Sequence, residues 1–174
     1  RFLGTNQPRA RSRAERCGLL SSDVGHVVSS SRHHRHSLYL IQNMDLPGLS
    51  DHERDLAGIV ARFHRRSQPK ADHPLLEHLP AVEVRLVRKL AAILRVADAT
   101  DRSRQQAVRA VEAQVRPRAV LVRLLPHKKR DLPTSSFEED AALFRAVFGR
   151  RLDIEIARVS AKRARRARAL SSRG

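Results

Sequence analysis

The sequence predicts a mainly α protein that ends in a small α+β lobe. Apolar residues recur with the helical period of about 3.6 residues as far as Arg104, most clearly between Val82 and Arg102. A Ser-x-x-Glu capping box at Ser50 marks the start of a helix within that stretch. After Arg104 the apolar residues alternate, which is typical of strands.

Four helices are expected before the change of period. The first begins near Cys17, and the second runs from about His33 to Asn43 before Pro47-Gly48 breaks the chain. The third starts at Asp51, directly after the Ser50 capping box. Residues 68–80 hold three prolines and are expected to form a loop before the long helix over 82–102.

The lobe is expected to contain three strands and one helix. Alternating apolar residues predict strands over 108–115 and 120–124, joined at Pro117-Arg118. A second capping box, Ser135 with Glu138, predicts a helix that ends at Gly149. A third strand is expected over 152–156.

Composition and period divide the chain into four stretches. The chain begins at Arg1 and not at Met, which indicates a piece of a longer protein. The stretches are a disordered or degenerate N-terminal segment (1–16), a helical domain (17–104), the small α+β lobe (105–158) and a basic disordered tail (159–174).

The charge of the chain favours polyanionic partners. Lys and Arg number 35 against 18 Asp and Glu, a formal net charge of +17. Such a surface attracts polyphosphate, nucleic acid or an acidic partner, and Arg can bind phosphate oxygens through two N–H groups at once. Aromatic residues make up only 3%, which argues against a stacking surface for single-stranded nucleic acid.

Other features of the composition bear on location. A single cysteine, Cys17, excludes an internal disulfide and agrees with a reducing cytoplasm. No run approaches the roughly 20 apolar residues that a membrane span requires, so no membrane association is expected. The basic N-terminus has no apolar run after it and therefore does not read as a secretory signal.

The histidines and arginines concentrate in two runs. One lies just before and within the second expected helix, and the other closes the third. Both imidazole and guanidinium donate hydrogen bonds to oxyanions, so the spacing favours phosphate binding, ahead of a solvated helix face and then of a metal site. The candidate phosphate-binding residues are Arg32, His33, His34, Arg35, His36, Arg62, His64, Arg65, Arg66 and Arg102.

Two acids stand on apolar helical stripes. Asp23 shares a stripe with Leu19, and Asp98 shares one with Leu94. An ionised carboxylate on an apolar face is unfavourable unless it is paired or bound to a metal. A buried Arg–Asp pair and a metal or phosphate site both remain open at this point.

Ordered strings of residues resemble one known family. The run Ser31-Arg32-His33-His34-Arg35-His36-Ser37-Leu38-Tyr39-Leu40-Ile41 resembles the helical region of the Ppx/GppA family, the exopolyphosphatases and guanosine pentaphosphate phosphohydrolases. Further strings extend the match to nearly everything from Leu19 to Ile156. They are Asn43, Asp45–Ser50, Val60–Arg65, Pro69, His73, Leu90–Arg102 and Phe144–Leu152.

The resemblance implies an HD-domain-like helical bundle over 17–104, followed by the small lobe. In HD phosphohydrolases a His-Asp pair and a later Asp bind a divalent metal, Mg²⁺ or Mn²⁺, and Asp23 and Asp98 match the two acids. The chain departs from that pattern at Ser22, where the pair has His. His34 and His64 are the residues that could complete a metal site with the two acids.

The resemblance also implies a division of labour. The family's hydrolysis belongs to an N-terminal actin-like domain with Gly-rich phosphate loops, which this chain does not contain. The expected role is that of an accessory region that binds polyphosphate or guanosine polyphosphate and contributes to a homodimer or to contacts with the catalytic domain. Whether the chain is itself an enzyme stays open.

Two alternatives come from other classes of protein. A free-standing HD-type phosphohydrolase would use a bound metal to activate water. A basic nucleic-acid-binding module would use the net charge, without sequence preference.

Overall fold

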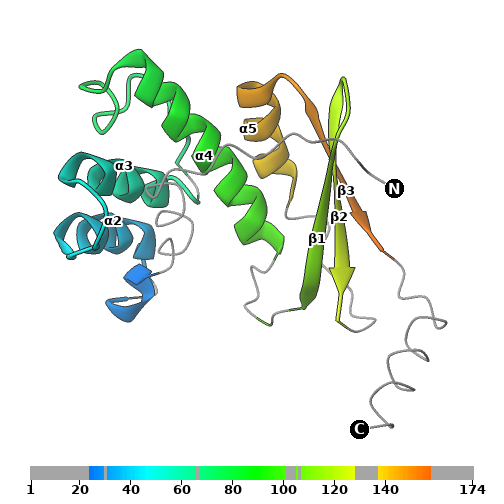
Figure 1. Cartoon of the computed structure of the whole chain (residues 1–174), viewed down its shortest axis with the longest axis horizontal. Coiled ribbons are helices and arrows are strands. Elements are labelled where there is room, and N and C mark those ends of the chain that lie inside the picture. Colours follow the sequence, from blue (N-terminus) through cyan, green and yellow to red (C-terminus); the bar gives the residue numbers. More distant parts are fainter. Residues whose placement is uncertain are drawn as a thin grey trace, which may run out of the picture. The chain divides into compact units, whose positions relative to one another are not determined.

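The computed structural model describes residues 24–29, 31–65, 67–100, 105, 107–127 and 137–157 (Figure 1). The chain divides into two compact units, with the boundary between Leu94 and Arg95. The four sequence-based stretches stay predictions. The predicted fold class, mainly α with a small α+β lobe, is confirmed. Among the described residues, none of the helices combines the length and the apolar character that crossing a bilayer demands.

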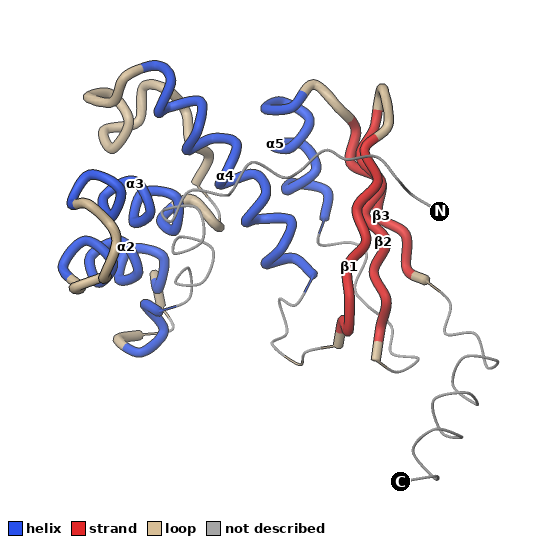
Figure 2. The backbone as a smooth tube through the Cα atoms, in the orientation of Figure 1, coloured by secondary structure: helices blue, strands red, loops and turns tan. Residues whose placement is uncertain are grey.

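The first unit is helical (Figure 2). It contains the 3-10 turn η1 (Val24–Val27), helices α2 (His33–Asn43) and α3 (Asp51–Arg62), and most of α4 (Ala81–Thr100). The bounds predicted for α2 and the predicted start of α3 are confirmed, and the long helix follows the prolines as expected. Of the helix expected from Cys17, only the part that forms η1 lies within the described residues.

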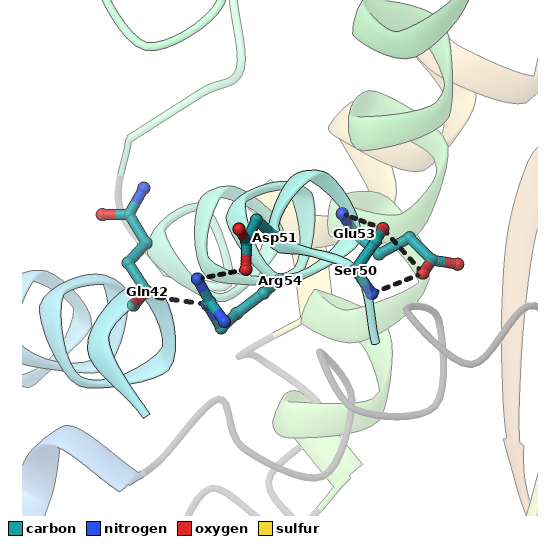
Figure 3. A network of polar contacts seen from close by, with 5 residues as sticks. All are labelled: Gln42, Ser50, Asp51, Glu53 and Arg54. Carbon is teal, nitrogen blue, oxygen red and sulfur yellow. Dashed lines mark hydrogen bonds and ion pairs between the residues drawn. The ribbon is translucent and has the colours of Figure 1, made fainter. Parts of the chain in front are cut away.

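Helix α3 begins at the predicted capping box (Figure 3). The Glu53 backbone N–H donates to Ser50 Oγ at 3.3 Å, and Glu53 Oε2 accepts from the Ser50 backbone N–H at 2.9 Å. One turn on, Arg54 pairs with Asp51 at 2.9 Å and donates to the backbone carbonyl of Gln42 at 3.0 Å. Arg54 therefore ties the start of α3 to the end of α2.

Helices α2 and α3 lie antiparallel and close together. A Cβ at Gly58 would lie 3.1 Å from Gln42 Cγ and 3.2 Å from Leu38 Cδ1, so the absence of a side chain permits the close approach. The opposite face of α3 packs on residues of the following loop and α4. That core consists of Leu56, Ile59, Val60, Phe63, Leu76, Val87, Ala91 and Leu94. The pairing places the beginning of α2 beside the end of α3.

The second unit contains a three-stranded sheet in the order β1-β2-β3. Strands β1 (Val108–Val115) and β2 (Ala119–Pro126) are antiparallel, and β3 (Arg151–Ile156) runs parallel to β2. All three predicted strands are confirmed. Helix α5 (Glu138–Phe148) connects β2 to β3, and its aromatic residues complete a core of Val96, Ala99, Val122, Leu124, Phe137, Phe144 and Leu152.

The predicted start of α5 needs correction. Ser135, expected as the N-cap, lies outside the described residues, and the N-cap is Phe137, without a side-chain hydrogen bond. The first turn holds Glu138, Glu139 and Asp140, and acids stabilise the positive end of a helix without a side-chain cap. The predicted end is confirmed, because Gly149 adopts the left-handed conformation at φ 64°.

Candidate anion-binding site

Helix α2 begins with basic residues and no acid. Its first turn holds His33, His34 and Arg35, and the preceding Arg32 has left-handed backbone angles and makes no side-chain capping bond. The N-terminus of a helix carries a partial positive charge and exposes N–H groups. Basic side chains here are unfavourable by themselves, but together they create a region of positive potential suited to an anion.

The end of α3 adds Arg62 and His64 to this region. His64 is almost fully buried, and its Nδ1 lies within hydrogen-bond distance of the Ala61 carbonyl, which can only accept. Neutral His64 therefore has its proton on Nδ1 and a lone pair on Nε2. His33 Nε2 lies 3.1 Å from His64 Nε2 and must be the donor. The two rings join the two helices through a defined pair of tautomers.

The turn η1 closes the cluster from a third side. The His26 ring stacks on His33 with 3.8 Å between centroids and 23° between planes. Gly25 makes this possible, since its N–H donates to Ser37 Oγ at 3.0 Å and a Cβ there would lie 2.1 Å from the His33 carbonyl oxygen. Only glycine permits η1 to lie this close to α2.

Arg62 is the most unusual member of the cluster. Its side chain is buried, with the residue only 8% exposed, and its Nη1 has no hydrogen-bond partner. Burial, and then the neighbouring charge of Arg35, lower the pKa of the guanidinium from its usual value. The contact recorded for the group is with the Phe63 ring, 5.9 Å from centroid to guanidinium carbon. A buried charge of this kind destabilises the fold unless an anion compensates it.

His34 responds to the same field. Burial, then the charges of Arg62, His33, His64 and Arg35, lower its pKa from 6.5 to about 4. His34 is therefore neutral near pH 7, with one ring nitrogen able to donate a hydrogen bond. The dependence on Arg62 and Arg35 shows that these side chains share one electrostatic environment.

The matched protein family agrees with this part of the chain. A family model described as Ppx/GppA phosphatase, domain III, matches residues 10–125. The chain belongs to the Ppx/GppA phosphatase family. The match includes the whole basic cluster together with α4, β1 and nearly all of β2. Helix α5 and β3 lie beyond the matched residues, so the resemblance of Phe144–Leu152 to the family stays a prediction.

The structure brings together five of the ten residues predicted to bind phosphate. We call His33, His34, Arg35, Arg62 and His64 the basic cluster. Three others, Arg32, His36 and Arg65, flank it along the chain, Arg32 exposed and the other two half-buried.

Two of the ten predicted residues, Arg66 and Arg102, lie outside the described residues. Their phosphate-binding role in this Ppx/GppA region therefore stays a prediction. The structure says nothing of where their side chains lie.

Residues that shape the cluster were not all found from the sequence. Gly25 and Ser37 carry no ionisable group, and their role depends on contact between segments twelve residues apart. Ser37 does have a detectable signal, because it stands four residues after His33, and the two share the buried stripe of α2 with Ile41. His26 belongs to the predicted histidine concentration, but its stacking on His33 depends on the turn.

The set predicted for a metal was Asp23, Asp98, His34 and His64. Asp23 lies outside the described residues, and Asp98 is in the second unit. Among the residues the structure describes, no group of three or more His, Cys, Asp or Glu side chains is placed to hold a metal ion. The basic cluster itself does not fit a divalent cation, because buried Arg62 would repel it.

Proposed function

We propose that this chain is the C-terminal accessory region of an exopolyphosphatase-like hydrolase, and that its basic cluster binds polyphosphate or a guanosine polyphosphate. Membership of the Ppx/GppA family supports the first part. The observation that carries the second is the buried Arg62 guanidinium, whose Nη1 has no partner, beside the start of α2.

A phosphate group supplies what this arrangement lacks. Its oxygens accept from guanidinium N–H groups, from the neutral His34 ring and from N–H groups at the start of a helix. Arg62 then gains a counter-charge, and the like charges of Arg35 and Arg62 are no longer opposed only to each other. Anion binding thus relieves an unfavourable arrangement that the folded protein carries without it.

A chain of phosphates suits the surroundings better than a single phosphate. Arg32 lies just before α2, and Arg65 lies just after α3, on either side of the cluster in sequence. Both fall in the predicted phosphate-binding set, and a polymer can contact several such groups at once. The formal charge of +17 gives long polyanions a further, non-specific attraction.

The chemistry of hydrolysis belongs to the catalytic domain of the parent enzyme. The described residues of the cluster include no carboxylate and do not fit a metal, so we assign them binding and orientation. We place the protein in the cytoplasm, in keeping with its single cysteine.

The test is binding of long-chain polyphosphate to the purified chain by isothermal titration calorimetry across a salt series. Affinity should fall steeply with salt, because neutralised phosphates release counterions. Arg62→Met should weaken binding by about tenfold or more, as loss of a charge-assisted contact predicts. Arg85→Met, which removes the same charge from an exposed position on α4, should change it less than about twofold.

Three results would contradict the proposal. Equal effects of Arg62→Met and Arg85→Met would mean that only net charge matters. Tighter binding of duplex DNA than of polyphosphate at equal charge would favour a nucleic-acid-binding module. Release of phosphate that requires Mg²⁺ or Mn²⁺ and stops with a chelator would make the chain a hydrolase in its own right.

A further inference from the structure

Strand β1 leaves one edge of the sheet open. It is the first strand in the order β1-β2-β3, and every residue in it except Val108 is exposed. Within the described part of the chain, no strand pairs with its outer edge. Open strand edges are templates for pairing with another chain, and proteins usually protect them.

The apolar face of the sheet continues onto this edge strand. Val111 lies opposite Leu124, and residues opposite one another in an antiparallel pair share a face. Leu124 is buried in the core of the second unit, whereas Val111 is 52% exposed and Val115 is 66% exposed. The core covers the face over β2 and β3 and leaves the valines of β1 in solvent.

The backbone groups of the same residues point outward. The Arg116 N–H donates to the Ala119 carbonyl at 2.8 Å, which shows the residues at even positions turned toward β2. Direction alternates along an antiparallel ladder. Val111, Ala113 and Val115 therefore turn their N–H and C=O groups to the outer edge.

We propose that this edge is an interface with a second copy of the chain, in which two β1 strands pair antiparallel about a two-fold axis at Ala113. Val111 then lies opposite the partner's Val115, and Ala113 opposite the partner's Ala113. The outward N–H and C=O groups of three residues in each copy bond to those of the other. The two apolar strips become one continuous surface.

The polar face of β1 selects this register. Glu112 lies opposite the partner's Gln114, which can donate to it, and diagonal to the partner's Arg116. An axis at Glu112 would place two carboxylates opposite each other. An axis at Gln114 would place Val111 opposite the partner's Pro117, which has no N–H to donate.

The interface is small, so the dimer is weak. Three residues from each strand provide far less than the roughly 1,200 Å² typical of stable complexes. Each copy also carries +17, which opposes association. Added salt screens that repulsion and strengthens the dimer, whereas it weakens polyphosphate binding. The two activities are thereby distinguishable in one salt series.

Disulfide trapping tests the interface and its register. In a Cys17→Ser background, Ala113→Cys places two thiols across the axis, with Cα atoms about 5.5 Å apart, within the range that a disulfide spans. Ala110→Cys is the matched control, since it is also exposed but its two copies lie about 20 Å apart, given the rise of a strand. Oxidation should yield dimer from Ala113→Cys at least about tenfold faster, as proximity predicts.

Sedimentation of the full chain supplies the second measurement. The Cys17→Ser protein should form dimer increasingly with concentration and salt, and Val115→Lys should abolish it without changing the melting temperature. Equal trapping of both cysteine variants, or a monomer at every salt and concentration, would overturn the proposal. So would slow amide exchange at Ala113 in a proven monomer, because a segment of the same chain would then cover the edge.

Discussion

The two ends of the α2–α3 pair use arginine in opposite ways. At one end, Arg54 has a carboxylate and a backbone carbonyl as partners, supplied by Asp51 and Gln42. At the other end, Arg62 is more deeply buried and its Nη1 has none. Both residues stand on α3, so the helix itself does not explain the difference. Arg54 stabilises the fold, and Arg62 is held ready for an anion.

The largest expected effect comes from breaking the basic end alone. Gly25→Ala would force a Cβ against the His33 carbonyl and Ser37, and we expect the free energy of unfolding to fall by about 2–3 kcal/mol, as for other forced overpacking. Chemical denaturation measures the loss. The His33 and His64 ring signals should shift in NMR spectra, while the Ser50 capping box keeps its amide protection. An unchanged stability would mean that η1 does not pack as described.

Exchanging the two arginines for methionine should separate stability from binding. Arg62→Met replaces an uncompensated buried charge and should raise the free energy of unfolding by about 1–2 kcal/mol while it weakens polyphosphate binding. Arg54→Met leaves the Gln42 carbonyl without its donor and should lower it by about 1 kcal/mol with little effect on affinity. Thermal melts and calorimetry of both variants check this. Destabilisation by Arg62→Met would indicate that Arg62 has a structural role.

The basic end should also depend on pH. The pKa of His34 is lowered to about 4 in the fold, so between about pH 6.5 and 4 the unfolded chain binds a proton that the folded chain does not. Stability should therefore be complete above pH 6.5 and decline as pH falls, on the order of 1 kcal/mol once solvent screening of the half-exposed ring is allowed for. His34→Gln should remove this share of the decline. Bound polyphosphate should reverse the trend, since it favours protonated His34 and gains affinity at lower pH.

The smallest effect is expected at the paired end. Asp51 is largely exposed, with its side chain 89% accessible, so Asp51→Asn should lower stability by only about 0.5 kcal/mol. A denaturant series with Ser50→Ala as reference checks this, because loss of that cap should destabilise by about 1 kcal/mol. A larger loss for Asp51→Asn would show that the carboxylate acts mainly on the helix dipole.

Local signals account for what could be predicted. The Ser50 capping box, the prolines before α4 and the alternation in β1 each act within a few residues, and the elements that they predict lie where expected. The capping signal at Ser135 failed because acids in the first turn of α5 stabilise a later start. The order of the strands, with β3 beside β2, depends on packing of α5 and has no local signal.

The site was predicted as a list but not as an arrangement. Residue type and clustering selected His33, His34 and Arg62, since cations concentrated in two runs are visible in a sequence. That Arg62 is buried, and that its Nη1 has no partner, could not be predicted, because burial depends on how α2 and α3 meet. The contribution of Gly25 depends on a close approach between η1 and α2, which no spacing within either segment reveals.

The hydrogen bond between His33 and His64 has a practical consequence for spectroscopy. With one ring protonated on Nε2 and the other on Nδ1, the four ring nitrogens fall into protonated and bare types whose ¹⁵N resonances are far apart. An anion at Arg62 changes the field at both rings directly. Labelled histidine would therefore report occupancy of the site in the unmodified protein, with no probe attached.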